Sequence, residues 1–562
     1  MLGFRWMRAV IALAIVGCGD DGTTPQADTS SGSSSSSSST TSDASTSSTS
    51  GVVDESSSSG SSSESTGGPP VEPLVWTRDC MVEGADLGVL HDGLECTGIE
   101  VPLDWDAPDG EQIIVAAERV RTTAPRRGAV LLLDGGPGAS GLGFFATPQI
   151  IDPLLAAGYD VVVPNHRGTV SPGLRCTFPV QSEECRSELE QAWGDGLRHF
   201  NTVQAARDVR ELVTRMNAGF LATETIVYGV SYGTFFASHV LQTSGDQLTG
   251  VVLDSVLPYG IDVSEQEIVV QGRAVDLLQR CVDDPVCGPR VGFASGEEFA
   301  EAIVSAIDDG DCGGYDNGAW ADSNYRAFFG GMLNTKGLRD YLPLIGALLT
   351  RCTTESSDLA SMAISQLLGG TIPYTPGNDR YGVPPALFYS QEVFAVVVAT
   401  MLVGDGVDTA AAITAAQQNF ASNGILEAVD GANQFFGDLP NPQWSTEPAP
   451  DVPVLVLAGR YDTQTPLPWA ERETDRVDAT LVVFDDTMHA LAFPGTGGKY
   501  ADGTPCAMSI IGAFIDAPNT TPDSSCAAEL RGVDVNLVSD FLQTTNMDAF
   551  GVADPWSLLP PP

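Results

Sequence analysis

Residues 225–254 constrain the fold more than any other stretch of the chain. An apolar strand is expected at Thr225–Tyr228, followed by the turn Gly-Val-Ser231-Tyr-Gly, a helix over 232–241 and a second apolar strand over 248–253. Small residues on both sides of Ser231 allow a sharp strand-to-helix turn, whose strained backbone tolerates little side-chain bulk. This pattern predicts a parallel sheet, with the serine hydroxyl raised at the carboxyl edge of the sheet.

Short apolar runs alternate with helix-like stretches on both sides of this unit. Near-continuous apolar strands are typical of a sheet that helices cover on both faces. The first two expected strands are joined by a Pro-Asp-Gly turn, which indicates a hairpin. The expected strands lie at 98–105, 112–122, 129–133, 160–163, 452–458 and 479–484, and further helices lie at 202–216 and near 533–542.

Residues 258–450 interrupt this alternation with a mainly helical texture. An insertion of this length is a domain rather than a loop. The sequence therefore predicts an α/β architecture with a mostly parallel sheet and a large, mainly helical cap between its late strands. The predicted divisions are an export signal at 1–18, a tether at 19–70, the core at 71–257 and 451–562, and the cap at 258–450.

The first 18 residues are typical of an export signal. Arg5 and Arg8 precede an apolar stretch, residues 9–16, that is too short to span a bilayer as a mature helix. The segment Ile-Val-Gly-Cys18 resembles the bacterial lipobox, in which the cysteine is lipidated and becomes the first mature residue. An ordinary signal peptide with a chance cysteine is the alternative. We predict an exported bacterial lipoprotein of the cell envelope, lipidated at Cys18.

The segment 19–70 consists almost entirely of Ser, Thr, Gly and Asp. With almost no apolar residues, it cannot bury enough surface to offset the entropy of ordering. We therefore expect a flexible tether, with an end-to-end distance of roughly 40 Å.

Charge excludes one class of partner. The chain holds 27 basic and 73 acidic residues, a formal net charge of −46 at pH 7. Such a chain is repelled by nucleic acid and by anionic membrane surfaces. We therefore expect no nucleic-acid partner, and contact with a membrane through the lipid anchor only.

Ten cysteines remain once Cys18 is set aside. An even number in an exported chain indicates disulfides, and sequential pairing is the simplest arrangement because each loop is then short. Zinc binding is the alternative, but no Cys-x-x-Cys or His pair has ligand spacing. The candidates are Cys80, Cys96, Cys176, Cys185, Cys281, Cys287, Cys312, Cys352, Cys506 and Cys526.

A glycine-rich turn, Asp134-Gly-Gly-Pro-Gly138, follows the strand expected at 129–133. Such a turn lets backbone N–H groups face the space above the serine, where negative charge develops during acyl transfer. We predict that the N–H groups of Gly136 and Tyr232 form the oxyanion hole. A phosphate-binding loop is the alternative, but no Lys-Ser/Thr pair follows, as a P-loop requires.

A hydroxyl nucleophile needs a base, and neutral imidazole is suited to that role near pH 7. The chain holds five histidines, of which His489 alone follows Ser231 on a loop beyond an expected strand. This is the position of the base in the α/β-hydrolase order of serine, acid and histidine. His166 is the chief competitor, but it precedes the serine. We expect His166 and His239 to be packed residues, while His91 and His199 carry no signal.

Asp462 follows the strand expected at 452–458 directly, so its carboxylate is expected near the loop of the base. There it would fix the imidazole tautomer and stabilise the imidazolium. Asp254, at the end of an earlier strand, and Asp485 or Asp486, close to the histidine in sequence, are the competing candidates for the acid.

Taken in order, several motifs resemble those of one family. They are Val101-Pro-Leu-Asp-Trp105, Gly135-Gly-Pro-Gly138, Asn165-His-Arg-Gly-Thr169 with Ser171-Pro and Cys176, Gly229-Val-Ser-Tyr-Gly-Thr234, Gly459-Arg-Tyr-Asp462 with Thr465-Pro466, and Met488-His489 followed by Cys506 and Cys526. Over most of residues 75–545 the chain resembles the tripeptidyl aminopeptidases of the α/β-hydrolase superfamily, relatives of the prolyl aminopeptidases.

Three positions depart from the pattern of that family. The family usually has His or a similar residue where this chain has Asp134, and Asp before the Arg-Gly pair where this chain has Asn165-His166. A glycine normally precedes the catalytic histidine, where this chain has Met488. The insertion matches poorly, and it is expected to select the substrate.

The resemblance implies cleavage of short peptides from the amino-terminal end through an acyl-enzyme, with no metal or organic cofactor. An aminopeptidase must also hold the substrate's ammonium group, for which Glu265, Glu267 and Asp276 are candidates. A carboxylesterase or lactonase on the same triad is the first rival, since a small ester suits the same chemistry. A surface binding protein with an inactive hydrolase fold is the second.

Overall fold

The computed structural model describes residues 71–560, apart from 171–172, 219–223, 264, 309–321, 336, 352, 354–355, 357–358, 361–382, 404–407, 444–450, 494–504 and 531. The predicted export signal, the tether and Cys18 lie outside the described residues, so they stay predictions. In the described part no helix is both long and apolar enough to cross a membrane.

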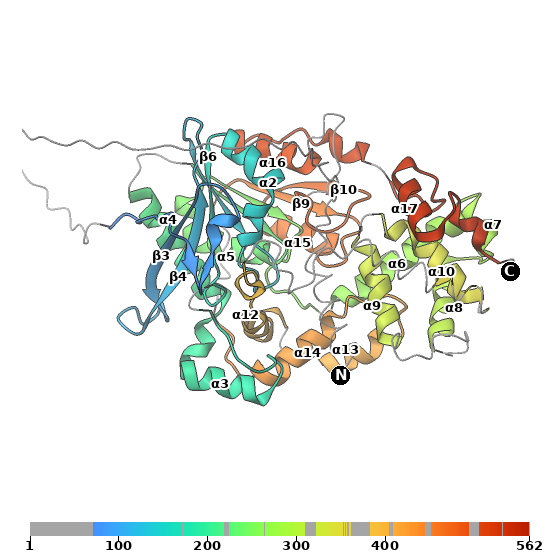
Figure 1. Cartoon of the computed structure of the whole chain (residues 1–562), viewed down its shortest axis with the longest axis horizontal. Coiled ribbons are helices and arrows are strands. Elements are labelled where there is room, and N and C mark those ends of the chain that lie inside the picture. Colours follow the sequence, from blue (N-terminus) through green and yellow to red (C-terminus); the bar gives the residue numbers. More distant parts are fainter. Residues whose placement is uncertain are drawn as a thin grey trace, which may run out of the picture.

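An eight-stranded sheet forms the centre of the molecule, in the order β10-β9-β8-β7-β5-β6-β4-β3 (Figure 1). The strands from β10 to β6 are parallel, and β4 and β3 add an antiparallel hairpin at one edge. This confirms the predicted α/β architecture. The strands are β3 Leu94–Pro102, β4 Gln112–Val120, β5 Gly128–Leu133, β6 Tyr159–Pro164, β7 Glu224–Val230, β8 Gly250–Asp254, β9 Val454–Gly459 and β10 Thr480–Phe484.

Helices cover both faces of the sheet, because successive side chains of each strand point to opposite sides. On β5, Leu131 and Leu133 join the apolar cluster on one face, while Val130 and Leu132 join the cluster on the other. The first face carries α4 Thr202–Ala218, α5 Tyr232–Ser244 and α15 Leu467–Val477, and the second carries α2 Pro148–Ala156 and α16 Cys506–Asp516.

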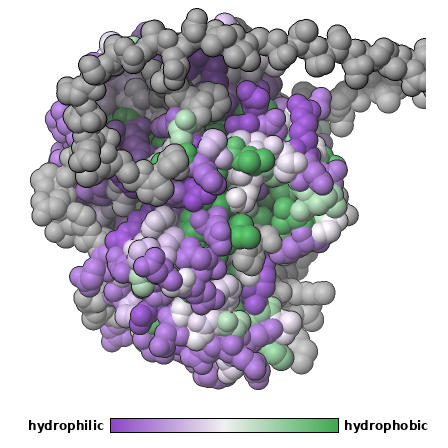
Figure 2. Space-filling view, turned by 90° about the vertical axis from the view of Figure 1, so that its left-hand side faces the viewer, coloured by the Kyte–Doolittle hydropathy of each residue, from purple (hydrophilic) through white to green (hydrophobic). Residues whose placement is uncertain are grey.

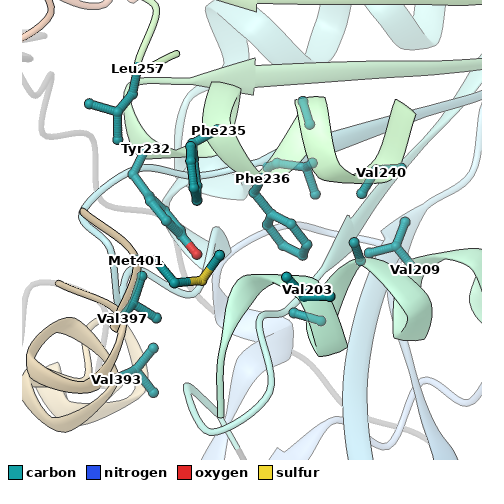
Figure 3. Packing of buried hydrophobic residues seen from close by; sticks show 14 of the residues in the cluster. Val203, Val209, Tyr232, Phe235, Phe236, Val240, Leu257, Val393, Val397 and Met401 are labelled. Atoms are coloured by element: carbon teal, nitrogen blue, oxygen red, sulfur yellow. The ribbon is translucent and has the colours of Figure 1, made fainter. Parts of the chain in front are cut away.

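Figure 3 shows the packing between α5 and α4 on the first face. Phe235 and Phe236 of α5 are buried near Val203 and Val209 of α4. This packing fixes the start of α5, which is the element that follows Ser231.

The insertion leaves the sheet after β8 and returns at β9, which pairs directly with β8. Its described helices pack in two ways. Helices α6 to α10 enclose an apolar cluster of their own, whereas α12 and α14 join the apolar cluster on the first face of the sheet. The helices are α6 Glu265–Asp283, α7 Cys287–Val291, α8 Gly296–Asp308, α9 Asp322–Leu333, α10 Leu342–Arg351, α12 Gln391–Val397, α13 Thr409–Ala416 and α14 Ile425–Phe436.

The C-terminal segment packs against the insertion and not against the sheet. Helix α17, Asp540–Phe550, lies beside α7 and above α6 and α10 in Figure 1, away from the strands. Leu537, Leu542 and Trp556 are buried in the cluster of the insertion. Sequence order alone assigned 451–562 to the core, but the apolar side chains of this tail find their partners on the inserted helices. The expected closing helix also lies later than 533–542.

Two short strands, β1 Met81–Val82 and β2 Ala85–Asp86, precede the sheet, and α3 Glu183–Trp193 follows β6. Four of the sequential cysteine pairs form disulfides, while Cys312 and Cys352 lie outside the described residues. The pairs are Cys80–Cys96, Cys176–Cys185, Cys281–Cys287 and Cys506–Cys526.

The face in Figure 2 is mainly hydrophilic, and its hydrophobic residues gather near the middle of the right-hand side.

Candidate active site

Ser231 lies on the turn between β7 and α5, with φ 57° and ψ −128°. Such a positive φ is costly for a residue with a side chain, and it is typical of functional turns. A Cβ at Gly229 would collide with the carbonyl oxygen of Gly233, and one at Gly233 would collide with that of Leu133. The two glycines of the motif are therefore required by the close approach of three backbone segments.

The glycine-rich turn after β5 passes directly over Ser231. A Cβ built on Gly135 would lie 3.0 Å from the serine Cβ and 3.4 Å from its Oγ. Gly136 adopts φ 110°, a conformation that favours glycine. Gly136 and Tyr232 line the same pocket as the serine. The role of their backbone N–H groups as oxyanion donors stays a prediction.

The structure brings His489 and Asp462 together at the carboxyl edge of the sheet. The two loops follow β10 and β9, which are adjacent and parallel, so both loops start at the same edge. Imidazole Nδ1 lies 2.8 Å from Oδ2 of the aspartate, and both side chains are buried. This is the geometry in which a carboxylate fixes the tautomer of a catalytic histidine.

The carboxylate of Asp462 is held by its own loop. Its Oδ1 accepts the N–H groups of Gln464 at 2.9 Å and Thr465 at 2.8 Å. The hydroxyl of Thr465 donates to Oδ2 at 2.7 Å and also lies 3.1 Å from Nδ1 of His489. Sequence reasoning did not assign Thr465 a role, although its spacing of three residues from the acid suits a local side-chain bond.

Asp254, a competing candidate for the acid, instead joins the loops of the serine and the histidine. Its carbonyl oxygen accepts the N–H of Ser231 at 3.0 Å. Its carboxylate accepts the N–H groups of Leu491 and Ala492, both at 2.9 Å. Burial raises the pKa of Asp254, while these N–H groups lower it. Asp254 thus fixes the loop that follows His489.

Asp485 and Asp486, although close to His489 in sequence, bind basic side chains instead of the imidazole. Asp485 pairs with Arg460, with an N–O distance of 2.8 Å, and Asp486 pairs with Arg280 at 2.9 Å. These ion pairs occupy both carboxylates, whereas Asp462 holds Nδ1 of His489.

The rival histidines are packed in the interior. The His166 ring lies 5.4 Å from that of Phe236, and its Nδ1 lies 2.9 Å from the carbonyl oxygen of Arg167. His239 bonds with the carbonyl oxygen of Phe235 at 2.8 Å. Burial lowers the pKa of His166 to about 4 and that of His239 to about 3, so both imidazoles are neutral near pH 7.

The departure at Asn165 has a local consequence. Asn165 Nδ2 donates to Glu118 Oε2 at 2.6 Å, and burial raises the pKa of this carboxyl to about 8. The next arginine, Arg167, forms a buried ion pair with Asp208 at 2.6 Å. Because Arg167 follows β6 and Asp208 belongs to α4, this pair holds β6 against α4.

A pocket opens above Ser231, between the sheet and the inserted helices. Most of its wall is apolar, and the remaining wall is formed by polar side chains. Thr465, whose hydroxyl touches the imidazole of His489, lines this pocket together with the serine. The lining residues are Gly136, Pro137, Ser231, Tyr232, Leu257, Val263, Gln266, Phe394, Val398, Leu402, Asn423, Gly424, Ile425, Val429, Gln464 and Thr465.

The three carboxylates considered for ammonium binding differ in their surroundings. Glu265 accepts the indole N–H of Trp469 at 2.9 Å, and Asp276 pairs with Arg273 at 2.8 Å. Glu267 is 3% exposed, and neither of its carboxylate oxygens has a hydrogen bond of normal length in the described part. Burial raises the pKa of Glu267 to about 7, although the nearby hydroxyl of Ser422 partly offsets this.

Glu267 does not itself line the pocket, but Gln266, Asn423 and Ile425 do, and the last two donate backbone N–H groups to its carboxylate. A buried carboxylate without a counter-ion is costly, so this side chain is the strongest candidate among the three. The described residues contain no group of three or more His, Cys, Asp or Glu side chains arranged to hold a metal ion.

Two family models match the chain. One, described as the alpha/beta hydrolase fold, matches residues 128–284, which include Ser231. The other, described as TAP-like protein, matches residues 437–526, which include Asp462 and His489. Most of the insertion lies between the two matched stretches.

Curated relatives match parts of the chain. The chain is 24% identical over 259 residues to serine protease Hip1 of Mycobacterium tuberculosis strain H37Rv, covering 41% of this chain and 48% of that protein. It is 35% identical over 134 residues to carboxylesterase B of the same strain, covering 23% and 25%. It is 26% identical over 217 residues to tripeptidyl aminopeptidase of Streptomyces coelicolor, covering 33% and 40%. The chain thus spans less than half the length of each relative.

Proposed function

We propose that this chain, an α/β hydrolase with a TAP-like C-terminal part, is an exported serine peptidase with Ser231 as nucleophile, His489 as base and Asp462 as acid. One observation carries the proposal. The buried pair of Asp462 and His489, joined at 2.8 Å, adjoins through Thr465 the pocket that the serine lines. The relatives named serine protease and tripeptidyl aminopeptidase support the same reaction class.

In the proposed reaction, Ser231 Oγ attacks the scissile carbonyl carbon while imidazole Nε2 of His489 takes the hydroxyl proton. Negative charge on the carbonyl oxygen is stabilised by the N–H groups of Gly136 and Tyr232. The tetrahedral intermediate then expels the amine, which receives the proton from His489 and leaves an acyl-enzyme. Water, deprotonated by the same imidazole, attacks the ester, and the released serine regains its proton.

We further propose that the enzyme acts from the amino-terminal end and releases single residues or di- or tripeptides. Glu267 supports this choice, because a buried carboxylate without a counter-ion, behind the pocket-lining residues Gln266, Asn423 and Ile425, suits a substrate ammonium group. The ammonium group would supply the counter-charge.

A carboxylesterase or lactonase is the second candidate. The pocket offers a largely apolar wall, including Leu257, Phe394 and Val398, which suits an alkyl acyl group. The relative named carboxylesterase B supports this second candidate.

Labelling with a fluorophosphonate tests the triad. The wild-type protein should react at Ser231, and Ser231→Ala should abolish labelling while the thermal unfolding curve stays that of the wild type. A folded Ser231→Ala protein that still reacts would show that another serine is the nucleophile. A wild-type protein that does not react would favour the binding protein with an inactive fold.

Matched peptides with free and acetylated amino termini separate the two substrate classes. An aminopeptidase that holds the ammonium group should cleave the free form at least tenfold faster, which corresponds to about 1.4 kcal/mol of binding. Glu267→Gln should remove most of this preference. Equal rates on the free and blocked peptides, together with rapid cleavage of simple esters, would favour the esterase.

A further inference from the structure

Most polar side chains of the pocket wall already form hydrogen bonds within the protein. Gln266 donates its amide N–H to the carbonyl oxygen of Gln464. Asn423 Nδ2 donates to the carbonyl oxygen of Thr463 at 2.8 Å, and its Oδ1 accepts from Asn334 at 3.2 Å. These contacts leave the amide nitrogens of Gln266 and Asn423 already bonded within the protein.

Gln464 is the exception. Its side-chain Nε2 is buried, yet it has no hydrogen-bond acceptor among the described residues, although the residue lines the pocket beside Ser231. Only 9% of Gln464 is exposed. A buried donor without an acceptor costs free energy, and natural proteins keep few of them without a functional reason. An acceptor supplied by a ligand would remove that cost.

The backbone of Gln464 is fixed next to the catalytic acid. Its N–H donates to Oδ1 of Asp462 at 2.9 Å, and its carbonyl oxygen accepts from Gln266 on the insertion. The backbone from which the side chain of Gln464 projects is therefore held by Asp462 at its N–H and by Gln266 at its carbonyl oxygen. A group that binds this amide is held in register with the scissile bond.

The surroundings select the chemistry of that group. An anionic acceptor is disfavoured, because the carboxylate of Asp462 already accepts the backbone N–H of Gln464 at 2.9 Å and the chain carries a net charge of −46. A neutral carbonyl oxygen fits. A peptidyl group has such an oxygen one residue before the scissile carbonyl, whereas a simple alkanoyl group has none.

We propose that Gln464 donates a hydrogen bond to the amide carbonyl that precedes the scissile one, and that it thereby favours peptidyl over alkanoyl substrates. This inference rests on the proposed hydrolase function and deepens it by naming the acyl group that the site prefers. Sites built to hydrogen-bond a substrate group discriminate against analogues that lack it, because the site's own group is then left without a partner.

The test uses two 4-nitroanilides with the same leaving group and the same free amine. One carries glycyl-alanine, and the other carries 5-amino-2-methylpentanoate, in which two methylenes replace the internal amide. We expect the wild type to favour the glycyl-alanine substrate in kcat/KM. Gln464→Met keeps the length of the side chain and removes the donor, so it should lower that preference about tenfold.

A matched control is Gln418→Met, at an exposed glutamine of the insertion outside the pocket, which should leave the preference unchanged. Thermal unfolding adds a second readout, since replacing an unpartnered amide should not destabilise the folded protein. If Gln464→Met lowers kcat/KM for both anilides by the same factor, or for neither, the inference is wrong. A wild type that cleaves no 4-nitroanilide carrying one, two or three residues would overturn the proposed peptidase function, and this inference with it.

Discussion

Thr465 connects the proposed acid and base more directly than any other described residue outside the proposed triad. Its hydroxyl is 2.7 Å from Oδ2 of Asp462 and 3.1 Å from Nδ1 of His489, so one oxygen touches both members of the pair. Because the hydroxyl donates to the carboxylate, its lone pairs face the imidazole N–H. Thr465 therefore restrains the ring in the orientation that leaves Nε2 free for the serine proton.

Thr465→Val tests this restraint, since valine keeps the branched shape and removes the hydroxyl. We expect kcat to fall by about 10- to 100-fold with a smaller change in KM, because the loss concerns the orientation of the base rather than substrate binding. Steady-state kinetics on a peptidyl anilide measures the effect. Thr465→Ser should restore most of the activity, and a serine variant as slow as the valine one would contradict the prediction.

Glu267 predicts a pH dependence of substrate binding. Burial raises the pKa of this carboxyl from 4.5 to about 7, so the carboxylate forms only as pH rises through about 7. A peptide amino group loses its proton near pH 8, so the ammonium group persists below that value. KM for free-amine peptides should therefore fall as pH rises from about 6 toward about 7.5 and rise again above about 8.

The measurement is a KM–pH profile on a substrate with a free amino terminus. Glu267→Gln should raise KM and remove the acidic limb, while an acetylated substrate serves as the matched control and should lack both limbs. An acidic limb that persists unchanged in Glu267→Gln would assign the titration to another group.

Local chain geometry was enough to propose three site residues from the sequence. Ser231 was proposed from its flanking glycines, and Asp462 and His489 from their places after strands; the structure brings the last two together, and the catalytic roles stay predictions. Gln464 could not be singled out, because whether its side-chain amide has an acceptor depends on how segments far away along the chain pack around it. Nothing in the sequence ranked Glu267 above Asp276, because the burial of Glu267 is visible only in the fold.

At the scale of elements, the insertion is hydrogen-bonded to the loop of the proposed catalytic acid, Asp462. Thr463 follows Asp462 directly, and its hydroxyl donates to Asn334 Oδ1 at 2.7 Å, just after α9. Asn334 donates to Asn423 Oδ1, and Asn423 Nδ2 returns to the carbonyl oxygen of Thr463 at 2.8 Å. All three side chains are buried, so this ring fixes two segments of the insertion against the acid loop.

Asn334→Ala should disturb the active site from outside it. The substitution leaves the Thr463 hydroxyl and the Asn423 carbonyl without a partner, which costs about 1–3 kcal/mol. We expect a lower unfolding temperature and roughly a tenfold loss of kcat, because the acid loop loses its fixed position. Kinetics combined with thermal unfolding measures both.

An exposed position on the insertion provides the control for this variant. Gln434→Ala on α14 should change neither kcat nor the unfolding temperature. Loss of stability in Asn334→Ala at unchanged kcat would show that the ring supports the fold without positioning the acid.

The apolar pattern of the sequence predicts some features of the elements, whereas tertiary packing decides others. Apolar runs predicted β5 to β10 because a strand buried on both faces must be apolar throughout. The helical texture of 258–450 predicted a cap, but not its division into a group around α8 and a group around α12 that joins the main core. Helical periodicity predicts which face of a helix is buried, but it does not predict which element that face packs against.

At the scale of the whole molecule, we expect membrane attachment through the predicted lipid anchor to be independent of catalysis in the folded part. If Cys18 is lipidated, Cys18→Ala should release the protein from the membrane fraction without changing kcat/KM, because the active site lies in the described part far along the chain. Fractionation of cells and incorporation of labelled palmitate measure the two expectations. Membrane retention and unchanged labelling in the variant would contradict the lipoprotein prediction.

The C-terminal tail connects the part that matches the TAP-like model, residues 437–526, with the helices of the insertion. After α16 the chain crosses to the inserted helices, where Asp534 N–H donates to Asp340 at 2.6 Å and Asn546 accepts the hydroxyl of Tyr341 at 2.6 Å. Trp556 is 3% exposed within the same cluster. The insertion is therefore held at both of its chain ends and also by a third, separate segment.

Trp556→Ala measures what this third attachment contributes. Removing a buried tryptophan should cost about 3–5 kcal/mol, and the loss should fall on the insertion, whose apolar cluster holds the side chain. Because the ring of Asn334, Asn423 and Thr463 joins the insertion to the acid loop, we expect fluorophosphonate labelling of Ser231 to decline at the same lowered temperature as the insertion unfolds. Trp556→Phe, which keeps an aromatic ring, should lose less. Labelling that survives unfolding of the insertion would show that the triad is assembled by the sheet alone.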